Sequence, residues 1–256
     1  MCNFGNGADC GEPMNESNFN TSNAFVTTRW SAVVSAGRSD STRAQAALAD
    51  LCQTYWFPLY AYARRKGHGP EDAEDLTQGF FARLLQLDSL SGLSREKGKF
   101  RAFLLASMNH YISDHWSRAT AQKRSVKLTL SLDAKQAEGR YLSELSDPLT
   151  PERAFERQWA IALLETVVQR LHLDYKEAGK EAQFMELRFA ITGEKKSAPY
   201  AELAERLGMK EEAVRVSVHR LRQRYRQLLR EEIAQTVAEP SEVNDELEYL
   251  RRVLAT

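Results

Sequence analysis

Residues Tyr200–Tyr225 read YAELAERLGMKEEAVRVSVHRLRQRY, a pattern that predicts two helices joined by a tight turn. Leu203 and Leu207 share one face of the first helix at helical spacing. Gly208 follows them, and glycine ends a helix in the left-handed conformation without Cβ strain. Ala204 supplies a small side chain where two crossing helices approach closely. The second helix would bury Val214, Val218 and Leu221. These features together are typical of a helix-turn-helix.

The second helix of this motif is strongly basic. Between Glu211 and Arg230 it carries six arginines against two glutamates, a net charge of +4. A basic helix beside such a turn is suited to lie against phosphates. The alternative is an ordinary helical hairpin with a solvated arginine face. Because the charge and the turn chemistry agree, the sequence favours DNA binding.

Composition argues against several other classes of protein, such as disulfide-rich, membrane-spanning and secreted ones. The 256 residues suffice for one or two domains with cores, and 35 basic residues balance 35 acidic ones, so net charge indicates no partner. Cys2, Cys10 and Cys52 lack metal-ligand spacing and predict a reducing cytoplasm without a disulfide framework. No apolar run reaches the roughly 18–20 residues that span a bilayer, and residues 1–23 do not read as a signal peptide. Strand signals are almost absent, so we expect an all-α cytoplasmic protein.

Helical periodicity covers most of the chain. It predicts helices at 28–35, 41–66, 70–85, 100–121, 151–171 and 175–191, before the helix-turn-helix. Pro58 is expected to kink or split the second of these. Pro70 and Pro151 each open a helix with acids in the first turn, which is a strong helix start. Residues 126–150 are expected to form an extended connector, although VKLTLSL alternates like one short strand.

The far end of the helix predicted at 100–121 is aromatic and basic. His110, Tyr111, His115 and Trp116 alternate with polar groups, and four bases without an acid lie between His115 and Lys127. Aromatic rings that stack on unpaired bases, with cations along the backbone, are what a single-stranded nucleic-acid surface needs. The alternative is that the rings are core residues and the bases a solvated face. This stretch alone leaves both interpretations open.

Three segments in this order resemble a bacterial RNA polymerase sigma factor of the extracytoplasmic-function (ECF) type, in a subgroup with longer chains. DAEDLTQGFFARLL (Asp72–Leu85) is similar to the segment that contacts the polymerase clamp. KFRAFLLASMNHYISDHWSRATAQKR (Lys99–Arg124) resembles the melting and −10 recognition segment, and AELAERLGMKEEAVRVSVHRLRQRY (Ala201–Tyr225) resembles the −35 reader. The resemblance covers about residues 44–233.

The resemblance implies roles for individual residues. Those expected to face the polymerase clamp are Asp72, Asp75, Leu76, Gln78 and Phe81. It places Asn109, Asp114, Arg118, Lys123 and Arg124 near the melted strand, where the aromatic pattern adds Tyr111, His115 and Trp116. Those expected at the −35 element are Lys210, Arg215, Val216, Ser217, His219 and Arg220 in the groove region, with Arg222 and Arg224 better placed for phosphates.

The same resemblance implies a domain organisation. It predicts a disordered tail at 1–27, a helical domain like sigma region 2 at 28–125 and a linker at 126–150. A domain like sigma region 4 follows at 151–237, and an acidic C-terminal helix at 238–256. Gly79 departs from the family, which usually has an acid at this position. The longer linker also departs, which indicates a different promoter spacing.

The function implied is promoter-specific transcription initiation with core RNA polymerase, through its clamp and flap, and with promoter DNA. An anti-sigma factor or another regulator is a further expected partner. The alternative is a stand-alone helix-turn-helix regulator that binds duplex DNA without polymerase. An enzyme is not expected: His110, Asp114 and His115 lack a third ligand group, so neither a metal nor a cofactor is predicted. The last segment carries five acids against two arginines, and we expect it to fold back or to bind a protein.

Overall fold

The computed structural model describes residues 41–85, 99–118, 134–143, 148–193, 199–237 and 239–255. These residues form helices and contain no strand, in agreement with the all-α prediction. The helices are α2 (Ser41–Arg65), α3 (Pro70–Leu85), α4 (Phe100–Arg118), α5 (Ala134–Ser143), α6 (Pro151–Glu177), α7 (Glu181–Leu187), α8 (Phe189–Thr192), α9 (Tyr200–Leu207), α10 (Glu211–Ala234), the 3₁₀ turn η3 (Pro240–Glu242) and α11 (Val243–Ala255). The tail at 1–27, the helix at 28–35 and the strand at 126–132 were predicted for residues outside the described ranges.

An aromatic core surrounds α2. Tyr55, Trp56 and Tyr60 are each at most 1% exposed, and the rings of Trp56 and Tyr60 stack with centroids 5.4 Å apart. Of the kink or split predicted at Pro58, the split does not occur, because α2 is continuous through Pro58. The same core takes in side chains from α3, α4 and the first half of α6, and also from the end of α10 and from α11.

A second core lies at the other end of the molecule, under the helix-turn-helix. Val214, Val218 and Leu221 of α10 are buried there with Leu203 of α9. Gly208 ends α9 with φ 61°, the left-handed conformation that the turn requires. The two helices and the tight turn predicted for this stretch are therefore present, with the buried face that their apolar spacing indicated.

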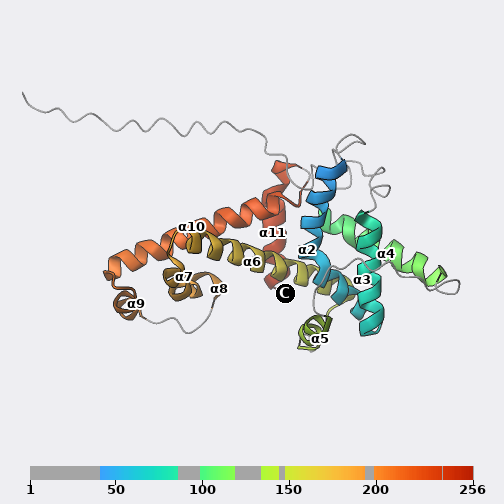
Figure 1. Ribbon diagram of the computed structural model, residues 1–256, viewed down its shortest axis with the longest axis horizontal. Coiled ribbons are helices and arrows are strands. Elements are labelled where there is room, and N and C mark those ends of the chain that lie inside the picture. Colours follow the sequence, from blue (N-terminus) through green and yellow to red (C-terminus); the bar gives the residue numbers. More distant parts are fainter. Residues whose placement is uncertain are drawn as a thin grey trace, which may run out of the picture.

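Two long helices run between these cores. Figure 1 shows α6 and α10 side by side, with α9 at one end of the pair and α2, α3 and α4 at the other. Thr150 caps α6 through the backbone N–H of Arg153, as its sequence predicted. α6 continues to Glu177 rather than Leu171, and Val167, Leu171 and Tyr175 of this helix pack in the second core. One helix thus contributes to both hydrophobic cores.

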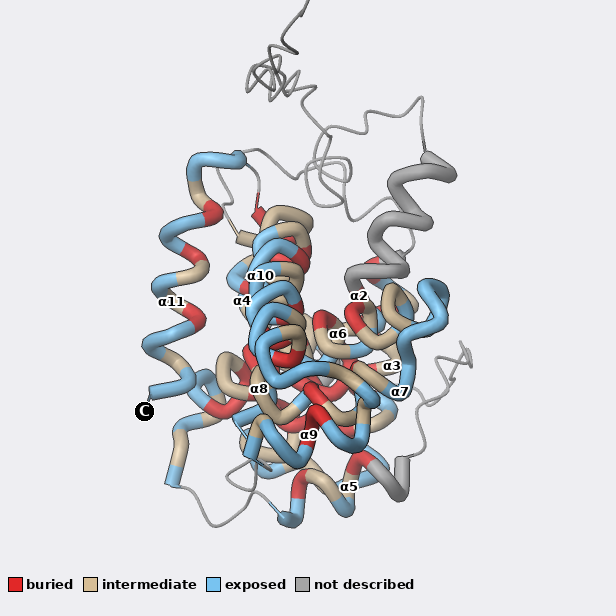
Figure 2. The backbone as a smooth tube through the Cα atoms, turned by 90° about the vertical axis from the view of Figure 1, so that its left-hand side faces the viewer, coloured by how far each residue is buried: buried red, intermediate tan, exposed pale blue. Residues whose placement is uncertain are grey.

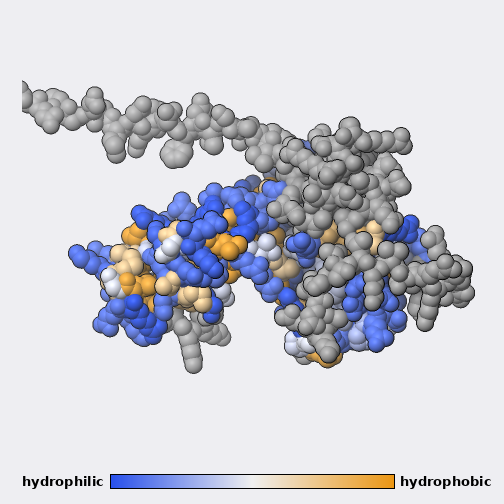
Figure 3. Space-filling model, in the orientation of Figure 1, coloured by the Kyte–Doolittle hydropathy of each residue, from blue (hydrophilic) through white to orange (hydrophobic). Residues whose placement is uncertain are grey.

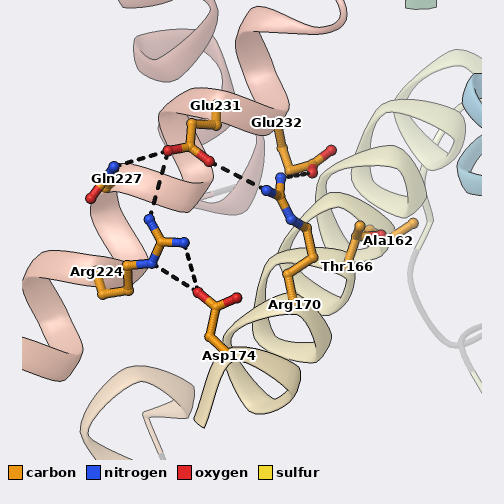
Figure 4. Close-up of polar contacts among 8 residues, drawn as sticks. All are labelled: Ala162, Thr166, Arg170, Asp174, Arg224, Gln227, Glu231 and Glu232. Carbon is orange, nitrogen blue, oxygen red and sulfur yellow. Dashed lines mark hydrogen bonds and ion pairs between the residues drawn. The ribbon is translucent and has the colours of Figure 1, made fainter. Parts of the chain in front are cut away.

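Ion pairs join α6 to α10 along their length. Figure 4 shows Arg170 of α6 between Glu231 and Glu232, and Arg224 of α10 against Asp174. The Arg224 Nη2 atom lies 2.7 Å from Asp174 Oδ2, and Arg170 Nη2 lies 3.3 Å from Glu231 Oε2. These cross-links hold the two helices in register, in addition to their shared apolar contacts.

The prediction of two domains joined by an extended linker is not confirmed. The connecting segment contains helix α5, and Glu138 of this helix pairs with Arg64 of α2 at 2.8 Å. The hydrogen bond from Arg64 lowers the pKa of Glu138, against the opposing effect of its partial burial. Tyr60 also donates a hydrogen bond to Glu138, at 2.5 Å. The segment is therefore attached to the N-terminal core where the structure describes it.

Candidate nucleic-acid interface

The exposed face of α10 is the centre of the candidate interface. Arg215, Val216, His219 and Arg220 are all exposed, and their one- and four-residue spacing places them on one face of the helix. Val216 is 49% exposed, which is unusual for an apolar side chain that has a core available beside it. Lys210 is exposed at the N-terminal end of this face. A stripe of cations with one apolar side chain can contact phosphates, base edges and thymine methyl groups.

The arginines of this face differ in whether they form an ion pair within the protein. Arg215 pairs with Glu211 at 2.7 Å, but its side chain is 63% exposed and the pair is of the i,i+4 type. Such an exposed pair is worth little and is easily exchanged for a phosphate contact. Arg220 makes no hydrogen bond or ion pair with another described residue. Arg220 is therefore available for a negatively charged ligand without the loss of an internal ion pair.

Three residues predicted at the −35 element make hydrogen bonds within the protein. Ser217 is partly buried and accepts a hydrogen bond from Gln183 of α7 at 3.0 Å. Arg222 donates from Nε to the carbonyl oxygen of Ala190 at 3.1 Å. Arg224 is held by Asp174, so a phosphate contact by Arg224 would have to compete with this ion pair. These hydrogen bonds reach α7, α8 and α6 in turn, and the linear sequence does not reveal them.

Arg226 extends the exposed face and was missed by the sequence analysis. It lies seven residues beyond His219, two turns along the helix, and is exposed without a partner among the described residues. The signal was present, because the seven-residue spacing places it on the same face. Figure 3 shows that the surface at the α9–α10 end is largely hydrophilic and is interrupted by hydrophobic residues.

The acidic helix α3 presents only part of the predicted polymerase contact. Asp72 and Asp75 are exposed, and Gln78 is partly exposed with its amide bonded to Glu74 at 2.8 Å. Leu76 and Phe81 are buried, with 5% and 0% exposed, so neither is available to a partner on the described surface. These two positions are corrected: they lie on the apolar face that attaches α3 to the N-terminal core.

The predicted strand-binding helix α4 packs closely on α2 and α3. Asn109 accepts a hydrogen bond from the Tyr62 hydroxyl of α2. Asp114 is exposed and lies 3.6 Å from Arg83 of α3. Predictions for the side chains of His115, Trp116 and Arg118, and for Lys123 and Arg124, fall outside the described side chains.

Tyr111 joins the core side of this helix rather than standing free. Its ring packs edge-on against Phe80, with centroids 5.8 Å apart, and lies near the guanidinium of Arg83. Partial burial raises the pKa of its hydroxyl. For this residue the core interpretation of the aromatic pattern fits better than a stacking platform.

Gly79 explains how Tyr111 is accommodated. A Cβ atom built at Gly79 would overlap the Tyr111 hydroxyl oxygen, whereas the ring carbon Cζ would be 3.5 Å away, an ordinary contact. The Tyr111 hydroxyl thus occupies the space that the side chain of the expected acid would need. The departure from the family pattern is matched by a side chain from another helix.

The effect of Gly79→Ala on the free energy of unfolding is expected to change sign when Tyr111 is replaced by phenylalanine. In the natural chain the clash with the Tyr111 hydroxyl costs about 1–3 kcal/mol, which outweighs the roughly 1 kcal/mol that alanine gains over glycine in a helix. With Tyr111→Phe in place, the same substitution should stabilise the protein. Urea unfolding of the two single variants and the double variant measures this coupling. Equal effects of Gly79→Ala in both backgrounds would contradict it.

Other kinds of site find no support among the described residues. No group of three or more His, Cys, Asp or Glu side chains there is arranged to hold a metal ion. No helix within the described ranges is long and apolar enough to cross a membrane.

Comparison with known families identifies the N-terminal helices. Residues 51–122 match the family model of sigma-70 region 2, a range that takes in most of α2 and all of α3 and α4. Searches of curated proteins and of solved structures gave no match. The region 2 match supports a sigma-70 family factor with a role in transcription initiation. Core RNA polymerase and promoter DNA are the partners that this family implies.

Proposed function

We propose that this chain is a promoter-specificity subunit of the ECF type, which binds core RNA polymerase and reads the −35 and −10 elements. The observation that carries the proposal is the combination of two features in one chain. Helices α2–α4 match sigma-70 region 2, and a basic helix-turn-helix presents Arg215, Val216, His219 and Arg220 to solvent. A protein of this kind has no catalytic reaction of its own, because the polymerase forms the RNA.

The two parts would divide the work by their chemistry. The exposed acids of α3, Asp72 and Asp75, suit a basic surface on the polymerase clamp. The exposed face of α10 suits the major groove, where Arg220 can reach a guanine edge or a phosphate. Phosphate contacts set affinity and register, whereas base-edge contacts set specificity. An anti-sigma factor or another regulator remains a proposed partner, with the polymerase flap as a second contact of the C-terminal part.

A stand-alone helix-turn-helix regulator is the competing function. Such a regulator binds its operator tightly without polymerase, whereas a sigma factor requires the core enzyme for tight promoter binding. We expect the purified chain to form a complex with core polymerase in gel filtration and to bind promoter duplexes weakly alone. Asp72→Lys should weaken polymerase association, while Glu71→Lys, which makes the same change of charge at another exposed acid of the same helix, is the control. Tight, sequence-specific duplex binding by the free chain would reject the proposal.

A further inference from the structure

The Arg215 guanidinium interacts with one side chain from each helix of the turn motif. On α10, its Nη2 atom lies 2.7 Å from Oε1 of Glu211, one turn earlier. From α9, it meets the ring of Tyr200, whose centroid lies 5.9 Å from Arg215 Cζ. At that distance a guanidinium is attracted to the face of an aromatic ring. Figure 2 views this end of the molecule and shows buried and exposed residues alternating along α9 and α10. Arg215 therefore links the two helices across the turn.

The two partners of Arg215 differ in what happens when a ligand arrives. The Glu211 carboxylate is a hydrogen-bond acceptor, so it competes with a phosphate or a guanine edge for the same N–H groups. Both side chains of that pair are well exposed, at 63% and 44%, so the exchange costs little. The face of an aromatic ring takes none of the five guanidinium N–H groups in a conventional hydrogen bond. The contact with Tyr200 can therefore persist while Arg215 binds DNA.

Tyr200 is itself held in place by the second core. It is the first residue of α9, its side chain is half-buried, and it packs against that core. The start of α9 is fixed by the Leu203 N–H, which donates to the Pro199 carbonyl oxygen at 3.1 Å. A long arginine side chain loses rotamer freedom when it binds a ligand, and a ring that already restricts it reduces this entropy cost. Tyr200 thus gives the mobile end of Arg215 a fixed support.

The other arginines of the exposed face lack such a support. Within the part of the chain that the structure describes, Arg220 and Arg226 make no ion pair or hydrogen bond and lie over no aromatic ring. A phosphate can be met by an arginine in many orientations, whereas a bidentate bond to a guanine edge requires the guanidinium plane to be aligned with the base. Of these three arginines, Arg215 is the one whose orientation is prepared for a base edge.

We propose that Tyr200 is a positioning residue for promoter recognition, because its ring orients Arg215 toward a base edge in the major groove. This role rests on the proposed function, since it assumes that α10 enters the groove. Loss of the ring should weaken binding to the cognate base pair more than binding to its variants. Loss of the hydroxyl alone should change little, because the ring face makes the contact.

A double-mutant cycle on the full chain in complex with core polymerase tests this role. The variants are Tyr200→Leu, Tyr200→Phe and Arg215→Ala, together with the double variant Tyr200→Leu/Arg215→Ala. Gln183→Ala is the matched control, because it removes a hydrogen bond to Ser217 of α10 from a residue that makes no printed-distance contact to Arg215. Fluorescence anisotropy gives the affinity for a promoter duplex and for duplexes with each single base-pair change in the −35 element.

Tyr200→Leu should weaken binding to the promoter by about two- to fivefold, the range for an exposed cation–π contact. The loss should be smaller on duplexes changed at one particular base pair, the pair that Arg215 reads. Tyr200→Phe should bind like the natural chain, and Tyr200→Leu should have no further effect once Arg215 is alanine. The effect of Gln183→Ala should be the same with arginine or alanine at position 215. Equal losses for Tyr200→Leu in both backgrounds would overturn the positioning role and leave Tyr200 as a packing residue.

Two-dimensional NMR of the arginine Nε–H groups tests the contact in the free chain, without DNA or polymerase. The Arg215 signal, identified by its absence from Arg215→Ala, should move in Tyr200→Leu and stay in place in Tyr200→Phe, because the aromatic ring shifts nearby protons. An unmoved signal in Tyr200→Leu would overturn the contact on which the proposal stands. If no chain bound promoter DNA with polymerase, the proposed function would be rejected and the promoter role of Tyr200 with it, although the NMR result would still establish the contact.

Discussion

Arg101→Ala is expected to lower the free energy of unfolding by about 3–5 kcal/mol, the range for removing one partner of a buried ion pair. Glu246 of α11 is buried 2.6 Å from Arg101 Nε, so the substitution leaves its carboxylate beside Lys99 alone and removes the group that Tyr249 and Trp159 pack against. Burial acts to lower the pKa of Arg101, yet the hydrogen bond and charge of Glu246 outweigh it and raise the pKa. The arginine is therefore charged in the folded state, and its removal leaves the buried Glu246 carboxylate without its main partner. Urea unfolding followed by circular dichroism measures the loss.

Arg251→Ala is the matched control for this experiment. Arg251 lies on the same helix as Glu246 and pairs with Glu248 at 2.6 Å, but both side chains are well exposed. An exposed pair of this type contributes less than about 1 kcal/mol. The comparison separates the buried cluster of Arg101, Glu246 and Lys99 from a general effect of removing an arginine that pairs with α11. A loss below about 1 kcal/mol for Arg101→Ala, equal to that of Arg251→Ala, would contradict the buried cluster.

Arg220→Ala and Arg224→Ala are expected to affect different properties. Arg220 is exposed and free of internal ion pairs, so its loss should weaken promoter binding by the polymerase complex by about 1–3 kcal/mol, or about 5- to 150-fold in Kd. Its effect on stability should stay within about 0.5 kcal/mol, as for ordinary surface substitutions. Arg224 is bound to Asp174, so its loss should lower stability by up to about 1 kcal/mol and leave DNA affinity nearly unchanged.

Fluorescence anisotropy with a labelled promoter duplex and the polymerase complex, at one fixed salt concentration, measures the affinities. Urea unfolding of the free chains measures stability. Arg226→Ala adds a third position, which should also lose affinity because Arg226 is exposed and lies in line with His219 along the helix. Equal losses of affinity for Arg220→Ala and Arg224→Ala would show that the two arginines face the DNA alike, against the geometry described above.

The two helices α9 and α10 and the turn between them could be predicted because the information for them is local. Gly208 takes the left-handed conformation that its position after Leu207 indicated, and Val214, Val218 and Leu221 form the buried stripe that their spacing indicated. Periodicity and capping depend on neighbours within a few residues, and these are visible in the sequence. The region 2 match at 51–122 agrees with the first two of the three segments quoted from the sequence.

The contacts that could not be predicted join distant residues. Arg101 and Glu246 are separated by 145 positions, and no local pattern relates them. Leu76 and Phe81 were assigned to a partner surface through a resemblance, yet they carry the apolar face of α3. From the sequence, Arg224 is one more arginine of a basic helix, because the sequence does not show that Asp174 of α6 lies beside it. In each case the missing information is the packing of one helix on another.

Transcription in vitro with core RNA polymerase, followed by mapping of the start sites, tests most directly whether the chain is a sigma factor. Core enzyme with this chain should produce transcripts from defined start sites on a genomic template library, with shared sequence motifs near −35 and −10. Core enzyme alone should not produce them, and Arg220→Ala should reduce them. If transcripts from core enzyme were the same with and without the chain, the chain would not be an initiation factor.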